Sequence, residues 1–343
     1  MSTVLVTGAT GFVGGGIARR LLADGRELRA LSRNPQSASG LSALGAEVVA
    51  GDVLDPASVE RAARGCDVVY HAAGMNGFCL RDPAPMHTAN VEGTVNVVTA
   101  CARAGVRRVV YTSSAATIGE AAGVIATEDS PHRGWFLSEY ERSKHDAEVA
   151  AVQAAAETGI ELVCVNPASV QGPGRTGGTA RLILDYANGK LRTLVRSRFS
   201  LVDADDCSAG HVLAETRGAA GRRYLLSGVC VTTDEAIATV ARLTGIERRT
   251  ITLPRPVALA AAEGVAAVAR VRKRRPRLCR EMVATLLHGH AYDGSRAADE
   301  LGLEYRSFED MVRRTLAWYV EQGMVSAPGT GLRTGPRGPI PPA

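Results

Sequence analysis

The first half of this 343-residue chain alternates two kinds of segment. Short runs rich in β-branched and apolar residues, as in buried strands, occur at 3–7, 27–31, 47–51, 67–72, 106–112 and 160–165. Stretches with a helical pattern lie between them, at 12–23, 56–64, 86–104 and 138–158. Such alternation predicts βαβ units joined by right-handed crossovers. We therefore expect an α/β fold with a doubly wound parallel sheet and helices on both of its faces.

The pattern changes after about residue 165. A Gly- and Pro-rich stretch at 166–178 is followed by shorter elements. They are expected at 179–188 (helix), 223–230 (strand), 233–244 (helix) and, as further helices, 257–270, 278–288 and 307–321. We expect residues 166–323 to form a smaller, mostly helical substrate-binding region that is interleaved with the sheet. The Pro- and Gly-rich segment 324–343 is expected to be a disordered tail.

The segment TGATGFVG, residues 7–14, lies between the first expected strand and the first expected helix. Its three glycines suit a tight turn, close approach of the backbone to a pyrophosphate, and close packing of the helix on the sheet. The phosphate would lie at the N-terminus of the helix, where free N–H groups and the helix dipole favour negative charge. We therefore predict a dinucleotide-binding domain of the Rossmann type over residues 1–165. The loop residues expected to contact the cofactor are Gly8, Thr10, Gly11, Phe12, Val13 and Gly14.

The ends of the second and third expected strands bear on the choice of cofactor. An NAD site commonly has an acidic residue at the end of the second strand, where it binds the ribose 2′-hydroxyl. Here Ser32 takes that place and Arg33 follows, and a guanidinium suits a 2′-phosphate. We therefore predict NADP, with NAD as the alternative. Asp52, followed by Val53, is placed to contact the adenine, unless Asp52 caps the helix that begins at Pro56.

The sequence YERSK, residues 140–144, contains the candidate acid/base. A free tyrosine has a pKa of about 10, and a nearby ammonium lowers that pKa because it stabilises the phenolate. A spacing of four residues puts Lys144 on the same helix face as Tyr140. The chain has only three lysines among its 40 basic residues, so a lysine here is informative.

A hydroxyl near the reacting oxygen is expected from YTSSAAT, residues 111–117, where the fifth expected strand ends. Ser114 is the candidate and Ser113 the alternative. The segment YANGK, residues 186–190, repeats the Tyr–Lys spacing, but its Asn-Gly pair is a turn signal that ends a helix. We therefore expect no reactive pair in YANGK.

Composition limits the other classes of function. No apolar run reaches the roughly 18 residues of a membrane span, and the N-terminus lacks the basic start of a signal peptide, so a cytoplasmic location is expected. Seven basic side chains gather in RVRKRRPRLCR, residues 270–280, and the rest of the chain has a net charge of −2. A nucleic-acid partner is therefore not expected. The basic segment is interpreted as a solvated loop, or as a site for an anionic group or partner.

The cysteines and histidines show no metal-binding spacing. The seven cysteines are widely separated, odd in number and without a C-x-x-C pair, so we expect reduced, buried thiols. HGH at 288–290 comes nearest to a ligand pair, but residues two apart do not share a helix face. We therefore predict that the protein has no metal site.

Several of these motifs together resemble the short-chain dehydrogenase/reductase superfamily, in its extended branch, the NAD-dependent epimerase/dehydratase family. They are TGATGFVG, Asp52, HAAG (71–74), TSSAA (112–116) and YERSK. The segments NVEGT (90–94), NPASVQGPG (166–174) and LVDADD (201–206) make the chain most similar to the dihydroflavonol reductase and 3β-hydroxysteroid dehydrogenase group. The resemblance extends from residue 3 to about residue 322. The run GGG at 14–16 departs from it, with more glycine than the motif needs.

The resemblance implies roles for individual residues. Tyr140 would be the acid/base, Lys144 would bind the nicotinamide ribose, and Ser114 would orient the carbonyl or alcohol. Further cofactor contacts are implied for His71, Ala72, Ala73, Thr112, Tyr140, Lys144 and, near the nicotinamide, Pro167. Many members of the family are dimers through a pair of helices like 86–104 and 138–158, so a homodimer is expected.

The expected activity is that of an NADP-dependent oxidoreductase, which interconverts a ketone or aldehyde and an alcohol. The segments MNGFCL (75–80) and GWFL (134–137) favour a hydrophobic or ring-bearing small molecule, although Trp135 and Phe136 can equally be ordinary packing. The alternatives are an NAD(P)-dependent sugar epimerase and a non-enzymatic dinucleotide-binding protein. A sugar dehydratase is disfavoured because Ala115 and Ala116 stand where dehydratases of this family carry an acidic pair.

Overall fold

The computed structural model describes residues 3–276 and 278–325, and within them the chain forms a seven-stranded parallel sheet of order β11-β7-β5-β4-β1-β2-β3. Its strands are β1 (Thr3–Thr7), β2 (Glu27–Ser32), β3 (Glu47–Ala50), β4 (Cys66–His71), β5 (Arg108–Thr112), β7 (Glu161–Pro167) and β11 (Arg223–Leu226). From β1 the chain winds outward to β3 and then continues from β4 on the other side of β1. The predicted doubly wound parallel sheet is confirmed, and its switch point lies between β1 and β4.

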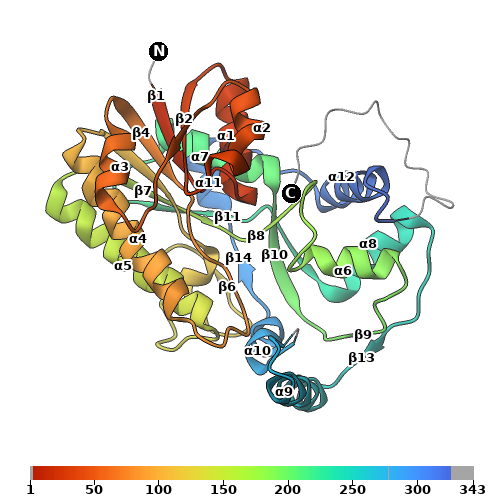
Figure 1. Ribbon diagram of the computed structural model, residues 1–343. Helices are drawn as coiled ribbons and strands as arrows, with labels where there is room; N and C mark the ends of the chain where they lie inside the picture. The colour runs from red at the N-terminus through yellow and green to blue at the C-terminus, as the bar shows by residue number, and fades with distance from the viewer. Residues whose placement is uncertain (1–2, 277, 326–343) are drawn as a thin grey trace.

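Helices cover both faces of this sheet (Figure 1). One face carries α1 (Phe12–Ala23), α2 (Ser39–Ala43), α7 (Ala204–Arg217) and α11 (Ser295–Leu301), and the other carries α3 (Pro56–Ala63), α4 (Ala84–Arg103) and α5 (Glu139–Thr158). Side chains of one strand alternate between the two cores, since Val4 and Val6 pack with α1 whereas Leu5 packs with α3 and α4. Strands buried on both faces are apolar throughout, which is why the sequence shows them as continuous runs.

A smaller part of the chain lies beside the carboxyl edge of the sheet (Figure 1). Its helices are α6 (Ala180–Ala187), α8 (Thr233–Thr244), α9 (Arg255–Val271), α10 (Arg280–His288) and α12 (Phe308–Glu321). Its short strands are β8 (Ser169–Gln171), β10 (Arg198–Asp203) and β12 (Val229–Thr232) in one sheet, β9 (Thr193–Leu194) with β13 (Ile251–Thr252), and β6 (Ile125–Ala126) with β14 (Ala291–Tyr292). Two 3-10 turns, η1 (Pro35–Ala38) and η2 (Ala115–Ile118), follow β2 and β5.

The second half of the chain returns to the main sheet. The boundary expected at residue 165 falls inside β7, and α7 and β11 return the chain to the main sheet. The strand expected over 223–230 is two strands, β11 and β12, in different sheets. Gly228 lies between them against the ring of Tyr305, where a Cβ would come within 3.0 Å of the ring. In the expected tail, Val325 is buried beside α12, and residues 326–343 lie outside the described residues.

One pair of cysteines is not reduced. Cys79 and Cys279 form a disulfide across 200 residues of sequence, so the expectation of reduced thiols throughout was wrong. The pair meets because α10 begins against the loop after β4. There, Glu281 accepts hydrogen bonds from the backbone N–H groups of Cys79 (3.1 Å) and Glu139 (2.8 Å). Tertiary packing alone brings these segments together, so cysteine spacing could not predict the bond. The free cysteines are buried, except for the exposed Cys230.

Replacing Cys79 with serine is expected to lower the free energy of unfolding by about 2–5 kcal/mol, because the unfolded chain is no longer constrained by a long covalent loop. Denaturant unfolding of the oxidised protein and the variant measures the difference. Cys230→Ser is the matched control, since it removes an exposed free thiol, and should change stability by less than about 0.5 kcal/mol. Equal stability of wild type and Cys79→Ser would contradict a structural role for the bond.

Candidate active site

The glycine loop joins the carboxyl end of β1 to α1 and touches β4 closely. Gly8 has a φ of +69°, and a Cβ there would lie 2.5 Å from the backbone nitrogen of Ala73. A Cβ on Gly14 would lie 2.3 Å from the carbonyl oxygen of Gly8. Gly11 is the N-cap of α1, so the first N–H groups of the helix point out at the switch point of the sheet. This cradle fits a dinucleotide pyrophosphate, and the cofactor contacts expected of its residues stay predictions.

The extra glycines of GGG have a packing explanation. A Cβ on Gly15 would lie 3.0 Å from the carbonyl oxygen of Ala9, and a Cβ on Gly16 would lie 2.6 Å from the hydroxyl of Ser208 on α7. Gly16 therefore lets α7 approach α1 across the face of the sheet. The sequence alone could not show this, because α7 lies almost 200 residues further along the chain.

Arg33 follows β2 and is exposed. The Ser32 hydroxyl donates to the carbonyl of Asn34 at 2.8 Å, and the Asn34 side chain accepts from the backbone of Gln36 at 3.2 Å. The turn is therefore held by its own residues. Among the described residues, no acidic group pairs with the Arg33 guanidinium, which leaves it available at the place where a 2′-phosphate would lie.

Asp52 does not cap the helix that follows it. Asp55 is the N-cap of α3 and accepts from the backbone of Ala57 at 3.1 Å. Asp52 instead accepts from the backbone of Leu54 at 3.0 Å, in a turn beyond β3. The capping alternative was wrong, and Asp52 stays a candidate for adenine contact. The side chain of Val53, its neighbour in that role, packs toward Gly93 of α4, where an added Cβ would lie 2.9 Å from it.

His71 ends β4, and its side chain is fully buried. Its ring nitrogens lie 2.8 Å from the Thr7 hydroxyl and 3.0 Å from the Thr94 hydroxyl, and its ring stacks on that of Tyr111. Burial and the charge of Lys144 lower the pKa of His71 to about 3. His71 therefore holds β4 against β1 and α4 as a neutral ring. The backbone of Ala72 and Ala73, rather than a side chain, lies beside the glycine loop.

The start of α5 is fixed by the residues around Tyr140. Ser138 caps the helix by accepting from the backbone of Glu141 at 3.0 Å. The Glu141 carboxylate forms a buried ion pair with Arg133, and the Ser143 hydroxyl accepts from Asn90 of α4 at 2.9 Å. The residues between Tyr140 and Lys144 thus anchor the other faces of the helix, which leaves the Tyr–Lys face directed at the end of β5.

Tyr140 lies beside Ser114 and Arg175. Burial raises the pKa of Tyr140, whereas a hydrogen bond with Ser114 and the positive charge of Arg175 lower it. The ring of Phe78 is tilted against the tyrosine ring at a centroid distance of 6.2 Å. The structure therefore brings the predicted tyrosine and serine together and places an aromatic side chain next to them.

Lys144 is anchored one helical turn further along. Its ammonium donates to the carbonyl of Thr112 at 2.9 Å and to the Tyr111 hydroxyl at 3.1 Å. Burial lowers the pKa of Lys144 to about 8, against the opposing effect of the Glu148 carboxylate one turn later. The lysine is thus a buried cation at the carboxyl end of β5, near Tyr140.

The choice between the two serines follows from a buried network. The Ser113 hydroxyl donates to Glu148, which also accepts from Asn166 at 2.6 Å and pairs with Arg223 at 3.2 Å. The Ser113 hydroxyl is therefore already bonded inside the protein. Ser114 faces Tyr140 instead, which favours the predicted residue over its alternative.

Thr112 and Pro167 end the neighbouring strands β5 and β7. The Thr112 side chain is bonded to His211 of α7 at 3.0 Å, so only its backbone faces the Lys144 side. Pro167 is buried at the end of β7. Both residues were predicted to lie at the nicotinamide end of the site. These contacts do not test that role, which stays a prediction.

Arg175 is a site residue that the sequence reasoning missed. Its guanidinium lies 5.3 Å above the ring of Phe12 in the glycine loop, and its Nε is buried without a hydrogen-bond partner among the described residues. Burial lowers its pKa. An arginine between the glycine loop and the candidate tyrosine suits an anionic part of a ligand. The available signal was its position directly after the turn sequence GPG.

The second Tyr–Lys spacing is unrelated to the site. α6 ends at Ala187, Gly189 has a φ of +68°, and Lys190 is exposed. The Tyr186 hydroxyl is bonded to the backbone of Ile246 and Arg248. The structure therefore separates this tyrosine from this lysine, as the turn signal predicted.

The two histidines of HGH do meet, contrary to the argument from helix faces. α10 ends at His288, and the left-handed Gly289 turns the chain so that both rings reach Glu120. The argument failed because 288–290 is not a continuous helix. Glu120, His288 and His290 could hold a metal ion, since their ligand atoms lie within 4.8 Å of one another. A 2.7 Å hydrogen bond between His290 and Glu120 already ties the end of α10 to the segment after η2.

Comparison with known proteins identifies the family. The sequence model of the NAD-dependent epimerase/dehydratase family matches residues 4–227, which include the glycine loop, YERSK and the end of β11. The chain belongs to this family. Within the family, the chain belongs to the dihydroflavonol reductase-like group of the extended short-chain branch, as the resemblance predicted.

Individual relatives match almost the whole chain. The sterol demethylase protein B of Methylococcus capsulatus is 33% identical over 94% of this chain and 100% of its own length. A putative dihydroflavonol 4-reductase of Synechocystis is 32% identical over 93% of this chain and 95% of its own length. The crystal structure of gox2253 covers 95% of this chain with a TM-score of 0.83 at 32% identity. The protein is therefore an NAD(P)-dependent enzyme of the reductase/dehydrogenase type, and the non-enzymatic alternative is set aside.

Proposed function

We propose that the enzyme interconverts a ketone or aldehyde and an alcohol on a hydrophobic or ring-bearing small molecule, with NADP as cofactor. The observation that carries this proposal is the meeting of Ser114, Tyr140 and the buried Lys144 beside the glycine cradle. Relatives over nearly the full length, named as a reductase and a sterol demethylase protein, support it.

Each residue has a defined part in this proposal. When bound, the nicotinamide supplies or accepts a hydride at the reacting carbon. In reduction the Tyr140 hydroxyl gives its proton to the substrate oxygen, while the Ser114 hydroxyl donates a hydrogen bond that orients that oxygen. The positive charge of Arg175 favours the phenolate that is left, and Lys144 binds the nicotinamide ribose. In oxidation the same groups work in reverse, and Tyr140 takes the proton from the alcohol.

Substrate class follows from the side chains near the tyrosine. Phe78 lies against Tyr140, and the loop that carries it is held by Asn90, which bonds the backbone of Met75 at 2.7 Å. Trp135 is 54% exposed, with Arg133 over its ring, and Phe136 packs against His132 and His145. The aromatic ring of Phe78 beside the tyrosine favours an apolar or ring-bearing substrate.

The direct test offers the purified enzyme a panel of cyclic and long-chain ketones with NADPH or NADH, and the matching secondary alcohols with the oxidised cofactors. The change in absorbance of the reduced nicotinamide reports turnover. Turnover of apolar cyclic ketones with NADPH is the expected result. The absence of any cofactor-dependent turnover across the panel would contradict the proposal.

A sugar epimerase is the second candidate, because Arg175 places a cation where the diphosphate of a nucleotide sugar could lie. Such an enzyme would interconvert two nucleotide sugars with no net change in nicotinamide absorbance. Chromatographic analysis of nucleotide sugars after incubation distinguishes it from a reductase.

Arg33→Ala is expected to weaken NADPH binding by about 10- to 100-fold, because a charge-assisted hydrogen bond to the 2′-phosphate is lost. NADH has no such phosphate, so its affinity should stay within about twofold and serves as the control in the same variant. Titration of nicotinamide fluorescence measures both. Equal changes for the two cofactors would show that Arg33 does not read the phosphate.

We also propose a homodimer through α4 and α5, which lie side by side on one face of the sheet (Figure 1). Val149 and Val152 on α5 are 55% and 45% exposed, which is unusual for two large apolar side chains on one turn of helix. Light scattering should give the mass of two chains for the wild type. A single-chain mass would contradict this assembly.

We also propose a cytoplasmic location. In the part of the chain that the structure describes, no helix has the length and hydrophobicity to cross a bilayer. Alkylation of free thiols at the moment of cell lysis, followed by mass spectrometry, tests the proposal through the redox state of Cys79. A free Cys79 agrees with a reducing compartment, and a fully oxidised one argues for an oxidising compartment.

A further inference from the structure

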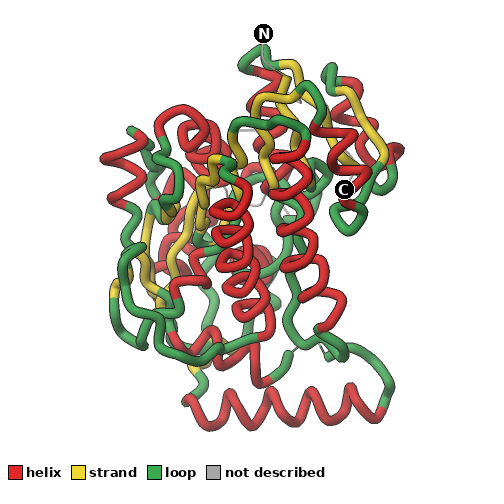
Figure 2. Tube along the Cα trace, turned by 90° about the vertical axis from the view of Figure 1, so that its left-hand side faces the viewer, coloured by secondary structure: helices red, strands yellow, loops and turns green. Residues whose placement is uncertain are grey.

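Helix α9 stands apart from the rest of the fold. With α10 it lies below the sheet and the helical part in Figure 1, and in Figure 2 it lies lengthwise across that end of the molecule. Of the 17 residues of α9, Ala258 and Ala262 are the buried ones. Most of its circumference therefore faces solvent.

The outward side of α9 is apolar. Val257, Ala261, Gly264, Val268 and Val271 follow the spacing of one helix face, and all five are exposed. The exposed fraction is 49% for Val257, 53% for Val268 and 85% for Val271. The charged residues inside the helix, Glu263 and Arg270, lie on another side of it. A solvated helix normally turns charged residues outward, so this apolar stripe needs another explanation.

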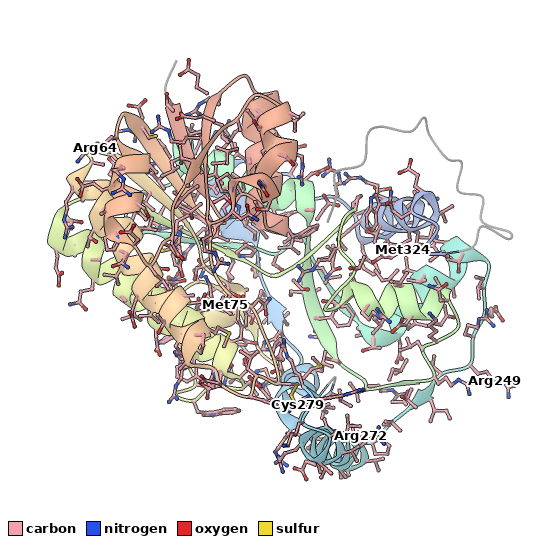
Figure 3. The ribbon with its side chains drawn as sticks, in the orientation of Figure 1. Arg64, Met75, Arg249, Arg272, Cys279 and Met324 are labelled. Atoms are coloured by element: carbon pink, nitrogen blue, oxygen red, sulfur yellow. A yellow bond between two sulfur atoms is a disulfide. The ribbon has the colours of Figure 1, made fainter. Side chains whose placement is uncertain are left out.

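A block of cations follows the stripe directly. Residues 270–280 carry seven basic side chains and no acidic one. Arg280 pairs with Glu263, and Arg275 donates to the carbonyl of Phe78 at 2.7 Å. Among the described cations of this block, Arg270, Arg272, Lys273 and Arg274 have neither an ion pair nor a side-chain hydrogen bond, and all four are exposed. Arg272 lies at the outer edge of the molecule in Figure 3.

The combination selects one kind of partner. Apolar side chains in line with a cationic end are typical of a helix that lies in the interface of a membrane containing anionic lipid. Nucleic acid would be bound through the cations and would leave the valines unused. A second copy of the same face would bring two cationic blocks together, which costs energy. We propose that α9 and residues 270–275 form a docking face for the surface of an anionic membrane.

A cationic cleft lies on a different side of α9 from the stripe. It has a volume of about 960 Å³ and lies between α9, the segments 270–276 and 279–281, and the loop at 79–81. Its two acidic residues are already engaged, Glu263 by Arg280 and Glu281 by the backbone of Cys79 and Glu139. The cations that line the cleft are Arg81, Arg270, Lys273, Arg274 and Arg280. The cleft adds to the positive charge at this end of the molecule, which favours approach to an anionic surface.

The docking face is connected to the mouth of the active site. The disulfide fixes α10 to the loop that carries Phe78, and Glu281 bonds the backbone of Glu139, the residue before Tyr140. The helix that carries the docking face is therefore connected through α10 to the segment that carries Tyr140. Docking itself does not depend on the proposed reaction, so it is testable without substrate.

Co-sedimentation of the full chain with vesicles is the test. Wild type should bind phosphatidylcholine vesicles that contain about 30 mol % phosphatidylglycerol, and should not bind pure phosphatidylcholine. The double variant Val268→Glu/Val271→Glu should weaken binding at least about tenfold, because the apolar face no longer enters the interface. The triple variant Arg272→Gln/Lys273→Gln/Arg274→Gln should weaken it about a hundredfold. These side chains are all exposed, and thermal unfolding checks that each variant is folded.

Matched controls lie elsewhere on the surface. Leu44→Glu changes an equally exposed apolar residue, at 57%, and Arg61→Gln/Arg64→Gln removes two exposed cations. Arg64 lies at the opposite end of the molecule from Arg272 in Figure 3. Both controls should bind like wild type. Failure of wild type to bind the anionic vesicles, or full binding by the valine variant, would overturn the proposal. Loss of the native oligomeric mass in the valine variant would assign the stripe to a second copy and overturn it too.

Discussion

Tyr140→Phe is expected to lower kcat by about 10²- to 10⁴-fold while the affinity for NADPH stays within a few-fold. The substitution removes only the hydroxyl, which is the group that transfers the proton and that Ser114 and Arg175 act on. The phenyl ring keeps its packing against Phe78, so the fold and the pocket should be preserved. Steady-state kinetics with an excess of NADPH, together with a fluorescence titration of NADPH, separates the chemical step from cofactor binding.

Tyr186→Phe is the matched control. Tyr186 has the same spacing to a lysine as Tyr140, but its hydroxyl bonds the backbone of Ile246 and Arg248, in the helical part of the molecule. Its loss should lower stability by about 1 kcal/mol and leave kcat within about twofold. If Tyr140→Phe kept full turnover, or if both variants lost activity equally, Tyr140 would not be the acid/base.

Gly14→Ala is expected to weaken NADPH binding at least about a hundredfold and to lower the free energy of unfolding by about 1–3 kcal/mol. The added Cβ would lie 2.3 Å from the carbonyl oxygen of Gly8 and 2.7 Å from its carbonyl carbon. Both atoms are backbone, so neither can rotate away, and the loop must move out of the position in which its N–H groups face a pyrophosphate. Fluorescence titration and denaturant unfolding measure the two effects.

Two other glycines provide control variants for this result. Gly40 lies in α2 with nothing within 4 Å of an added Cβ, so Gly40→Ala should not weaken NADPH binding or stability. Gly16 meets the Ser208 hydroxyl, the movable end of a side chain, so Gly16→Ala should fall between the two. NADPH affinity in Gly14→Ala equal to that of wild type would show that the backbone contact at Gly8 is not required.

The main sheet could be predicted because its strands are buried on both faces and its first helix follows the glycine loop. The expected range 12–23 for α1 is the observed one. α7 was missed for a physical reason. Its buried side includes Asp206, His211 and Glu215, whose partners Arg306, Thr112 and Tyr70 come from distant segments. A helix that buries polar groups lacks the apolar stripe by which a sequence reveals an amphipathic helix.

Some residues of the site could be predicted from the sequence and others could not. Tyr140, Lys144 and Ser114 could be named because a helix turn and a strand end have fixed geometries that the sequence encodes locally. Arg175 could not, because its place over Phe12 depends on how the chain returns after β8. The disulfide and the meeting of His288 and His290 at Glu120 also depend on where α10 packs. What remained unpredicted is therefore contact between segments far apart in sequence.

The buried lysine also sets how the stability of the empty enzyme responds to pH. The pKa of Lys144 falls from 10.5 to about 8 on folding, so the charged form costs the folded state about 3 kcal/mol at neutral pH. Between about pH 8 and pH 10.5 the folded protein has released this proton while the unfolded chain still holds it, and the contribution of Lys144 to stability rises across that window. A ligand whose oxygen atoms accept hydrogen bonds from the ammonium would offset this cost. Such a ligand should therefore stabilise the protein most at the pH where the lysine is charged.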